Sequence, residues 1–264
     1  MKLQILVSAM NQDGRALAEK MNLQAESIII DQCRENRYEE FEYKGNRMRC
    51  YHFAEKGVGL SRNNALLRAD GDLCLFADED IVYQEGAAQK VEDAFSKHPE
   101  ADMLLFNVKV QPARRTYWTE SFHRVHWYNC GRYPAYSFAL RTDRMHGKNL
   151  TYSLLFGGGA KYANGEDSIF IRDCLRAGLK VYAVPVEIGE EIPRPSTWFF
   201  GYDGKFFHDR GVLYHVLYGP LAMLMGWRFL WKMKQNLSKE GAALTLKQAA
   251  MHLSSGIRDG KKGL

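Results

Sequence analysis

Short apolar runs alternate with polar, helix-forming segments along this chain, and each of the first two runs ends in polar side chains. Residues 3–10 predict a β-strand that Asn11 follows, residues 15–21 predict a helix, and residues 27–30 predict a second strand that ends at Asp31. In open parallel sheets, ligands bind outside the carboxyl ends of the strands. Asn11 and Asp31 are therefore expected at one ligand-binding edge of a sheet.

The same alternation of strand and helix signals continues further along the chain. Pro99 ends the helix predicted over residues 86–98, and Gly178 is a C-cap signal for the helix predicted over residues 166–177. Further strands are predicted at residues 49–53, 73–77, 102–108 and 180–184, and a short helix at residues 65–69. This order of elements predicts an α/β sheet domain.

Length and charge divide the chain into a domain and a tail. The 264 residues are enough for one α/β domain with a terminal extension. We place the domain at residues 1–210 and a helical, basic and amphipathic tail at residues 211–264. The net charge of +5 resides mostly in that tail. Nucleic-acid binding by the main domain is not expected, since it would need a basic stripe across the folded surface.

The tail begins with a strongly apolar run over residues 212–231, which His215, Gly219, Pro220 and Arg228 interrupt. This pattern favours an interfacial helix over one that spans a bilayer. Aromatic and basic residues alternate at its end and predict an anchor for an anionic membrane surface: Trp227, Arg228, Phe229, Leu230, Trp231, Lys232 and Lys234. The alternative is a helix that docks on the catalytic domain or on a second copy in a homo-oligomer.

The five cysteines are scattered and show no C-x-x-C spacing, which indicates neither a disulfide framework nor a zinc site. Residues 1–8 contain too short an apolar run for a signal peptide. These features predict a cytoplasmic protein, and the tail would hold it on the inner face of the cell membrane.

Two acidic clusters carry the candidate chemistry. Asp78, Glu79 and Asp80 follow the apolar run at residues 73–77. A strand that ends in D-x-D presents two carboxylates on one face, where they can bind a divalent cation that in turn holds phosphate oxygens. The second cluster is the G-E-D string at residues 165–167, which offers a general base on the other side of a reacting centre. Together the clusters indicate group transfer from a nucleotide diphosphate.

Several strings resemble motifs of the family 2 glycosyltransferases. The G-x-S-x-x-R-N, A-x-G-(D/E) and D-x-D series of that family is matched, in order, by residues 59–63, 69–72 and 75–80. The match is shorter than the family motif by two residues between Ser61 and Arg62. Three further strings resemble a bacterial branch of the family: G-G-G-A-K-Y at residues 157–162, G-E-D-S-I-F at 165–170 and S-T-W-F at 196–199. The resemblance covers residues 3–210.

This resemblance implies a glycosyltransferase A-type fold, with a Rossmann-like, mixed and mostly parallel sheet flanked by helices, here followed by a C-terminal helical extension. It also implies a nucleotide diphosphate sugar as donor, which we expect to be a UDP-sugar, and Mn²⁺ or Mg²⁺ as cofactor. The reaction would be a single displacement that inverts the anomeric carbon. The expected acceptor is a saccharide or a polyprenyl-diphosphate-linked saccharide in cell-surface polysaccharide biosynthesis.

The motif match also implies roles for the acidic residues. Asp80 would bind the metal directly, and Asp78 would bind the ribose or the water shell of the metal. Asp167 would take the proton from the acceptor hydroxyl, with Glu166 as its neighbour. The structural alternative for Asp167 is to cap a helix N-terminus, which is compatible with catalysis. Asp31 would accept a hydrogen bond from the N3–H group of uracil.

Other matched positions have two expected roles each. Ser8 and Asn11 would touch the base or the ribose. Arg62 would contact the donor phosphates or brace its loop. His208 would be a third metal ligand, with a purely structural role as the alternative. Trp198 would stack on a sugar ring or pack against the sheet.

Two other functions remain open from the sequence. A nucleotidyltransferase has a similar sheet and acidic site, but it usually has a glycine-rich, basic loop after the first strand, and residues 8–13 read S-A-M-N-Q-D here. A catalytically silent binding protein would keep the fold and use its tail to recruit partners to a membrane. The intact D-x-D and G-E-D strings favour the enzyme.

Overall fold

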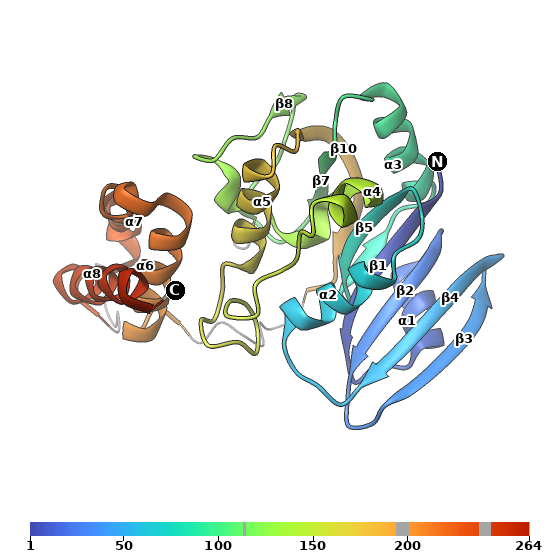
Figure 1. The fold of residues 1–264 in the computed structure, drawn as a ribbon, viewed down its shortest axis with the longest axis horizontal. Helices are drawn as coiled ribbons and strands as arrows, with labels where there is room; N and C mark the ends of the chain where they lie inside the picture. Colours follow the sequence, from blue (N-terminus) through green and yellow to red (C-terminus); the bar gives the residue numbers. More distant parts are fainter. Residues whose placement is uncertain (113–114, 194–200, 238–243, 264) are drawn as a thin grey trace.

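The computed structural model describes residues 1–112, 115–193, 201–237 and 244–263. One sheet lies at the centre of these residues, with helices packed on it (Figure 1). The strand order is β3-β4-β2-β1-β5-β9-β7-β10-β6, and β8 pairs with β10. The strands are β1 (Leu3–Met10), β2 (Glu26–Gln32), β3 (Arg37–Tyr43), β4 (Asn46–Phe53), β5 (Leu73–Asp78), β6 (Ile81–Tyr83), β7 (Met103–Lys109), β8 (His123–Arg124), β9 (Phe138–Arg141) and β10 (Val181–Glu191).

The sheet combines parallel and antiparallel pairs. β1 pairs in parallel with β2 and β5, β2 pairs in parallel with β4, and β7 pairs in parallel with β10. β3 and β6 run antiparallel at the two edges, and β9 lies antiparallel between β5 and β7. The prediction of a mixed, mostly parallel sheet flanked by helices, with a helical C-terminal extension, is confirmed.

Helices cover both faces of the sheet and create two apolar cores. α1 (Gly14–Met21) and α3 (Ala87–Lys97) contribute to one core, whereas α2 (Val58–Arg68), α4 (Thr142–Gly147) and α5 (Glu166–Arg176) contribute to the other. Side chains alternate along β1, so that Ile5 and Val7 face the first core and Leu6 faces the second. A strand buried on both faces reads as a continuous apolar run, which is why β1 and β2 were predictable.

Four strands, β3, β6, β8 and β9, were not expected from the sequence. β3 reads R-Y-E-E-F-E-Y, and Phe41 is its one buried side chain. Charged residues suit an exposed edge strand, since they discourage pairing with another chain. Helix α2 was also longer than expected, because it begins at Val58 and includes the G-L-S-R-N string.

Three C-terminal helices gather at one end of the molecule, away from the sheet (Figure 1). They are α6 (Gly204–Tyr218), α7 (Ala222–Leu237) and α8 (Leu246–Gly263), and they share an apolar core that includes Phe207, Leu230 and Leu253. α6 and α8 approach each other closely at Gly211 and Gly256. At either position a Cβ atom would clash with the backbone of the other helix, so the contact requires glycine.

α6 also contacts the sheet domain. Its Val212 and Leu213 form a cluster with Phe156, Tyr162 and Ile169, which precede or belong to α5. The division into domains at residue 210 stays a prediction, and α6 runs through that position.

The apolar residues of α7 divide between the bundle core and the surface. Leu230 is buried and Phe229 packs against the core, so these two side chains do not face outward as expected. Trp227 and Trp231 are exposed. Among the described residues, no helix combines the length and the apolar character that crossing a bilayer requires.

Candidate active site

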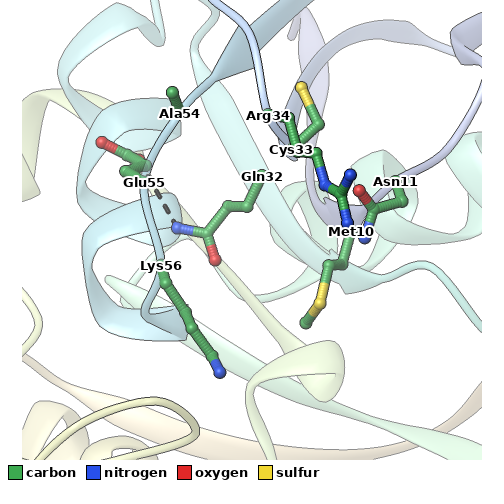
Figure 2. A pocket seen from close by; sticks show the side chains of 8 residues that line it. All are labelled: Met10, Asn11, Gln32, Cys33, Arg34, Ala54, Glu55 and Lys56. Atoms are coloured by element: carbon green, nitrogen blue, oxygen red, sulfur yellow. Dashed lines mark hydrogen bonds between the residues drawn. The ribbon is translucent and has the colours of Figure 1, made fainter.

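A pocket of about 460 Å³ lies where β1, β2 and β4 end at the same edge of the sheet. Figure 2 shows Gln32 in this pocket, with Glu55 and Lys56 on one side and Asn11 and Arg34 on the other. The full lining is Met10, Asn11, Gln32, Cys33, Arg34, Ala54, Glu55 and Lys56. The carboxyl ends of neighbouring strands are the usual place for a nucleotide in an α/β sheet.

The turn after β1 is held by hydrogen bonds to β2. Asn11 has a left-handed backbone, with φ 53°, and its N–H donates to the carbonyl of Gln32 at 3.2 Å. The N–H of Gln12 donates to Asp31 Oδ1 at 2.9 Å, and His52 Nδ1 lies 3.0 Å from Asp31 Oδ2. Asp31 is 2% exposed. Both of its oxygens therefore have partners within the chain, and a uracil N3–H would have to share one of them.

The network behind this turn crosses four neighbouring strands. Arg37 of β3 donates from Nη2 to His52 Nε2 of β4 at 3.1 Å. The same Nε2 lies 3.3 Å from Glu39 Oε1, and His52 Nδ1 lies 3.0 Å from Asp31 Oδ2 of β2, whose other oxygen accepts from Gln12 after β1. The edge strand that the sequence did not predict thus supports the wall of the pocket.

The pocket is joined to the N-terminus of α2. The side-chain amide of Gln32 donates to the carbonyl of Gly57 and accepts from the N–H of Gly57, each at 3.1 Å. One turn later, Ser61 Oγ donates to Ser8 Oγ at 3.0 Å, which holds α2 against β1. Ser8 therefore lies behind the pocket edge and fixes the helix that carries Arg62.

Arg62 joins the two acidic motifs. Its Nη2 donates to Asp78 Oδ1 at 2.9 Å, and its Nη1 donates to Asp167 Oδ1 at 2.6 Å and lies 3.3 Å from Glu166 Oε1. The Arg62 side chain is 4% exposed, and its guanidinium lies over the ring of Tyr152. One buried cation thus holds carboxylates that come from distant parts of the chain.

Burial makes the Asp167 carboxylate costly to ionise. Desolvation raises the pKa of Asp167 to about 7, with Arg62 opposing the shift and the charges of Glu166 and Asp78 adding to it. Asp167 Oδ2 also accepts a hydrogen bond from the N–H of Ala135 at 2.9 Å. Asp167 lies in the first turn of α5, where the helix dipole favours a negative charge. A carboxylate with a pKa near neutrality is suited to accept and release protons.

Glycines shape the loop that precedes α5. Gly157 has φ 106°, and a Cβ atom there would lie 2.9 Å from Glu166 Cδ. The carbonyl of Gly158 accepts from the N–H of Val58 at 3.0 Å, so the loop is tied to the start of α2. Gly165 also has positive φ and packs against Leu213 of α6. The G-E-D string is therefore held between α2 and the C-terminal helices.

The three residues of the D-E-D string have different surroundings. Glu79 accepts from the N–H of Met10 at 2.7 Å and so braces the end of β1. Asp78 is 28% exposed, whereas Asp80 is 6% exposed and its carbonyl accepts from the N–H of Ile192. Carboxylate oxygens are the ligands that Mg²⁺ and Mn²⁺ prefer, so Asp78 and Asp80 fit a divalent cation by their chemistry.

The structure does not bring Asp78, Asp80 and His208 together as one set of metal ligands. Within the described part of the chain, the clusters with metal-ligand spacing are Asp31 with Cys33 and His52, and Glu39 with Cys50 and His52. His208 lies on α6, where its Nε2 is 3.0 Å from Asp259 Oδ2 of α8. This contact matches the structural alternative for His208. Trp198 lies outside the described residues.

Several residues of the site were not found from the sequence. Gln32, Arg34 and Lys56 line the pocket, and His52 supports it from behind. The available signal was their position: Gln32 and His52 lie at the ends of β2 and β4, and Arg34 and Lys56 follow within three residues of those ends. Polar residues at the carboxyl ends of buried parallel strands lie at the ligand-binding edge of a sheet.

Comparison with known proteins identifies the family. Residues 5–163 match the family model described as glycosyl transferase family 2. The structure is similar to that of S. aureus TarS 1–349 in complex with UDP-GlcNAc, with a TM-score of 0.59 and 14% sequence identity over 97% of this chain and 72% of that chain. For S. aureus TarS 1–349 in complex with UDP, the TM-score is 0.56 and the identity 14%, over 100% of this chain and 72% of that chain.

At this low identity the structural likeness shows the fold, and it confirms the expected glycosyltransferase A-like architecture. No curated protein sequence matches this chain significantly. The family model covers more than half of the chain, including the G-L-S-R-N and D-E-D strings and the triple glycine. The chain therefore belongs to glycosyl transferase family 2.

Proposed function

We propose that this chain is an inverting glycosyltransferase that moves one sugar from a UDP-sugar to a hydroxyl group of a saccharide acceptor. The observation that carries the proposal is the cluster in which Arg62 holds Asp78 of one acidic motif and Asp167 of the other. Members of the same family transfer sugars from activated donors. Here the two acidic motifs meet at Arg62 of α2, and the start of that helix is hydrogen-bonded to Gln32 of the pocket at the strand ends.

The donor would bind in the pocket at the ends of β1, β2 and β4. The S. aureus TarS structures in complex with UDP-GlcNAc and with UDP support a uridine nucleotide. We assign contact with the base or ribose to Asn11 and contact with the diphosphate to Arg34 and Lys56, whose positive charges suit phosphate. Ser8 supports the site by accepting a hydrogen bond from Ser61 of α2, and Asp31 supports it by accepting one from the N–H of Gln12 in the turn after β1.

Mn²⁺ or Mg²⁺ would be held by Asp78, which ends β5 beside Arg62, and by Asp80 in the turn that follows. When bound there, the ion would neutralise charge on the leaving diphosphate. Asp78 also forms an ion pair with Arg62. We expect this ion pair to rearrange when the metal binds, so that metal and donor bind cooperatively.

The chemical step we propose uses Asp167 as general base. The acceptor oxygen attacks the anomeric carbon, the bond from that carbon to the diphosphate oxygen breaks, and the hydroxyl proton passes to Asp167. The electron pair of the broken bond leaves with the nucleoside diphosphate. A pKa raised to about 7 by burial suits a base that works near neutral pH. Arg62, which also pairs with Glu166, holds Asp167 in position.

The acceptor we propose is a saccharide of a cell-surface polysaccharide, free or linked to polyprenyl diphosphate. A lipid-linked acceptor would be met at an anionic membrane surface. Family membership favours this enzyme over a nucleotidyltransferase or a silent binding protein, both of which would leave the G-E-D base without a function.

The test is the thermal stability of the protein with UDP, GDP, CMP and dTDP, each with and without Mn²⁺. A ligand that binds only the folded state raises the melting temperature. We expect the largest increase with UDP and Mn²⁺ together, and transfer from a UDP-sugar panel to follow. An increase with another nucleotide would reassign the donor, and no increase with any nucleotide would refute the proposed function.

A further inference from the structure

One side of α7 presents large apolar side chains to solvent. Leu224, Trp227 and Trp231 are 66%, 57% and 75% exposed. At about 100° per residue, their spacing places them within a sector of about 60° around the helix. These three residues are called the α7 face below.

The α7 face lies on the opposite side of the helix from the bundle core. Ala222, Leu230 and Leu237 of α7 are buried against α6 and α8. On the helical wheel these residues are about 60° or more from every residue of the α7 face. The exposed apolar surface is therefore not used to hold the bundle together.

Basic residues flank the α7 face on both sides. Arg228 and Lys232 are exposed on one side of the sector, and Lys234 is exposed on the other. α7 contains no Asp or Glu, so no acidic side chain of its own offsets these charges. Tryptophan next to lysine and arginine is typical of helices that lie in the headgroup region of an anionic membrane.

We propose that the α7 face inserts into the surface of a bilayer that contains anionic lipids, with Arg228, Lys232 and Lys234 at the lipid headgroups. Large aromatic side chains bury much apolar area, and each basic residue near an anionic surface strengthens binding about fivefold. The inference goes beyond the transfer reaction, because binding to a bilayer needs neither donor nor acceptor.

The experiment is flotation of the full chain with vesicles of phosphatidylcholine, with and without phosphatidylglycerol. We expect binding to the anionic vesicles and a loss of about tenfold or more in Trp227→Ala/Trp231→Ala. Arg228→Gln/Lys232→Gln should weaken binding to anionic vesicles and reduce its dependence on salt. The matched control is Trp127→Ala, which removes a tryptophan that is 50% exposed and lies outside α7; it should bind like the unchanged chain.

Three outcomes would overturn the proposal. These are absence of binding to any vesicle, equal binding by the double tryptophan variant, and a dimer in solution that the same variant abolishes, which would make the α7 face a contact between copies. Nucleotide binding by every variant is measured in parallel. If it is retained while vesicle binding is absent, the membrane proposal fails and the proposed donor site stands.

Discussion

Replacing Asp167 by Asn should change how stability depends on pH. In the folded protein the pKa of Asp167 is raised from 3.8 to about 7, chiefly by burial. Because the folded value lies above the unfolded one, the contribution of this group to stability is fully present below about pH 3.8 and is lost as the pH rises through about 7. Asn cannot ionise, so this loss is absent from the variant.

The size of the effect follows from the shift. Three pKa units at about 1.4 kcal/mol each give an upper bound of about 4 kcal/mol for the cost of the charged form. Most of the change falls above about pH 5, where the free energy of unfolding of the variant relative to the unchanged protein should rise by roughly 2–3 kcal/mol between about pH 5 and pH 8. The variant also loses one hydrogen bond from Arg62, which lowers the free energy of unfolding by a similar amount at both pH values. The difference between the two pH values is therefore unaffected by that loss.

The assay is urea unfolding at both pH values, followed by two probes so that cooperative unfolding is verified. The same variant should lose transfer by about 10²–10⁴-fold while it retains donor binding. Asp173→Asn is the matched control, since it removes a carboxylate from the same helix that does not contact Arg62; it should retain transfer. A stability difference that is equal at both pH values would refute the reasoning about Asp167.

Other substitutions test the remaining parts of the site. Asp80→Ala should abolish the metal-dependent part of UDP affinity in calorimetry with and without Mn²⁺; unchanged affinity would assign Asp80 to structure. Arg62→Met should lower the free energy of unfolding by about 3–5 kcal/mol, because it leaves buried carboxylates without their cation; a loss below about 1 kcal/mol would contradict this. His52→Leu should weaken UDP binding about tenfold, because the turn that Asp31 holds loses its support. His52→Asn keeps a hydrogen-bond donor near the position of Nδ1 and should bind UDP within about threefold of the unchanged protein. Equal UDP binding by the two variants would show that His52 does not support the pocket.

The sequence predicted the elements that have a strong local signal. β1 and β2 are continuous apolar runs, and α5 has acidic residues in its first turn and a glycine after its end. β3 escaped because its charged side chains resemble a loop, and its stability comes from pairing with β4. Local patterns record the period of an element but not the partner that a polar strand finds.

The candidate site shows the same limit. Asp78 and Asp167 were identifiable from their motifs, but nothing in the sequence indicated that Arg62 would reach both. Leu230 was expected to face lipid, and it packs in the bundle because helix α7 has a second apolar side. Such contacts depend on tertiary packing, which a single sequence does not display.

The contact of Leu213 with Gly165 has a consequence for how this protein can be dissected. Leu213 belongs to α6 and packs directly behind the G-E-D turn, together with Val212. A chain cut after residue 210 would end inside α6 and leave the turn before Asp167 without its apolar support. Loss of activity on removing the C-terminal helices would then report a disturbed base rather than a lost membrane anchor, so the two roles are separable only by point substitutions on the outer side of α7.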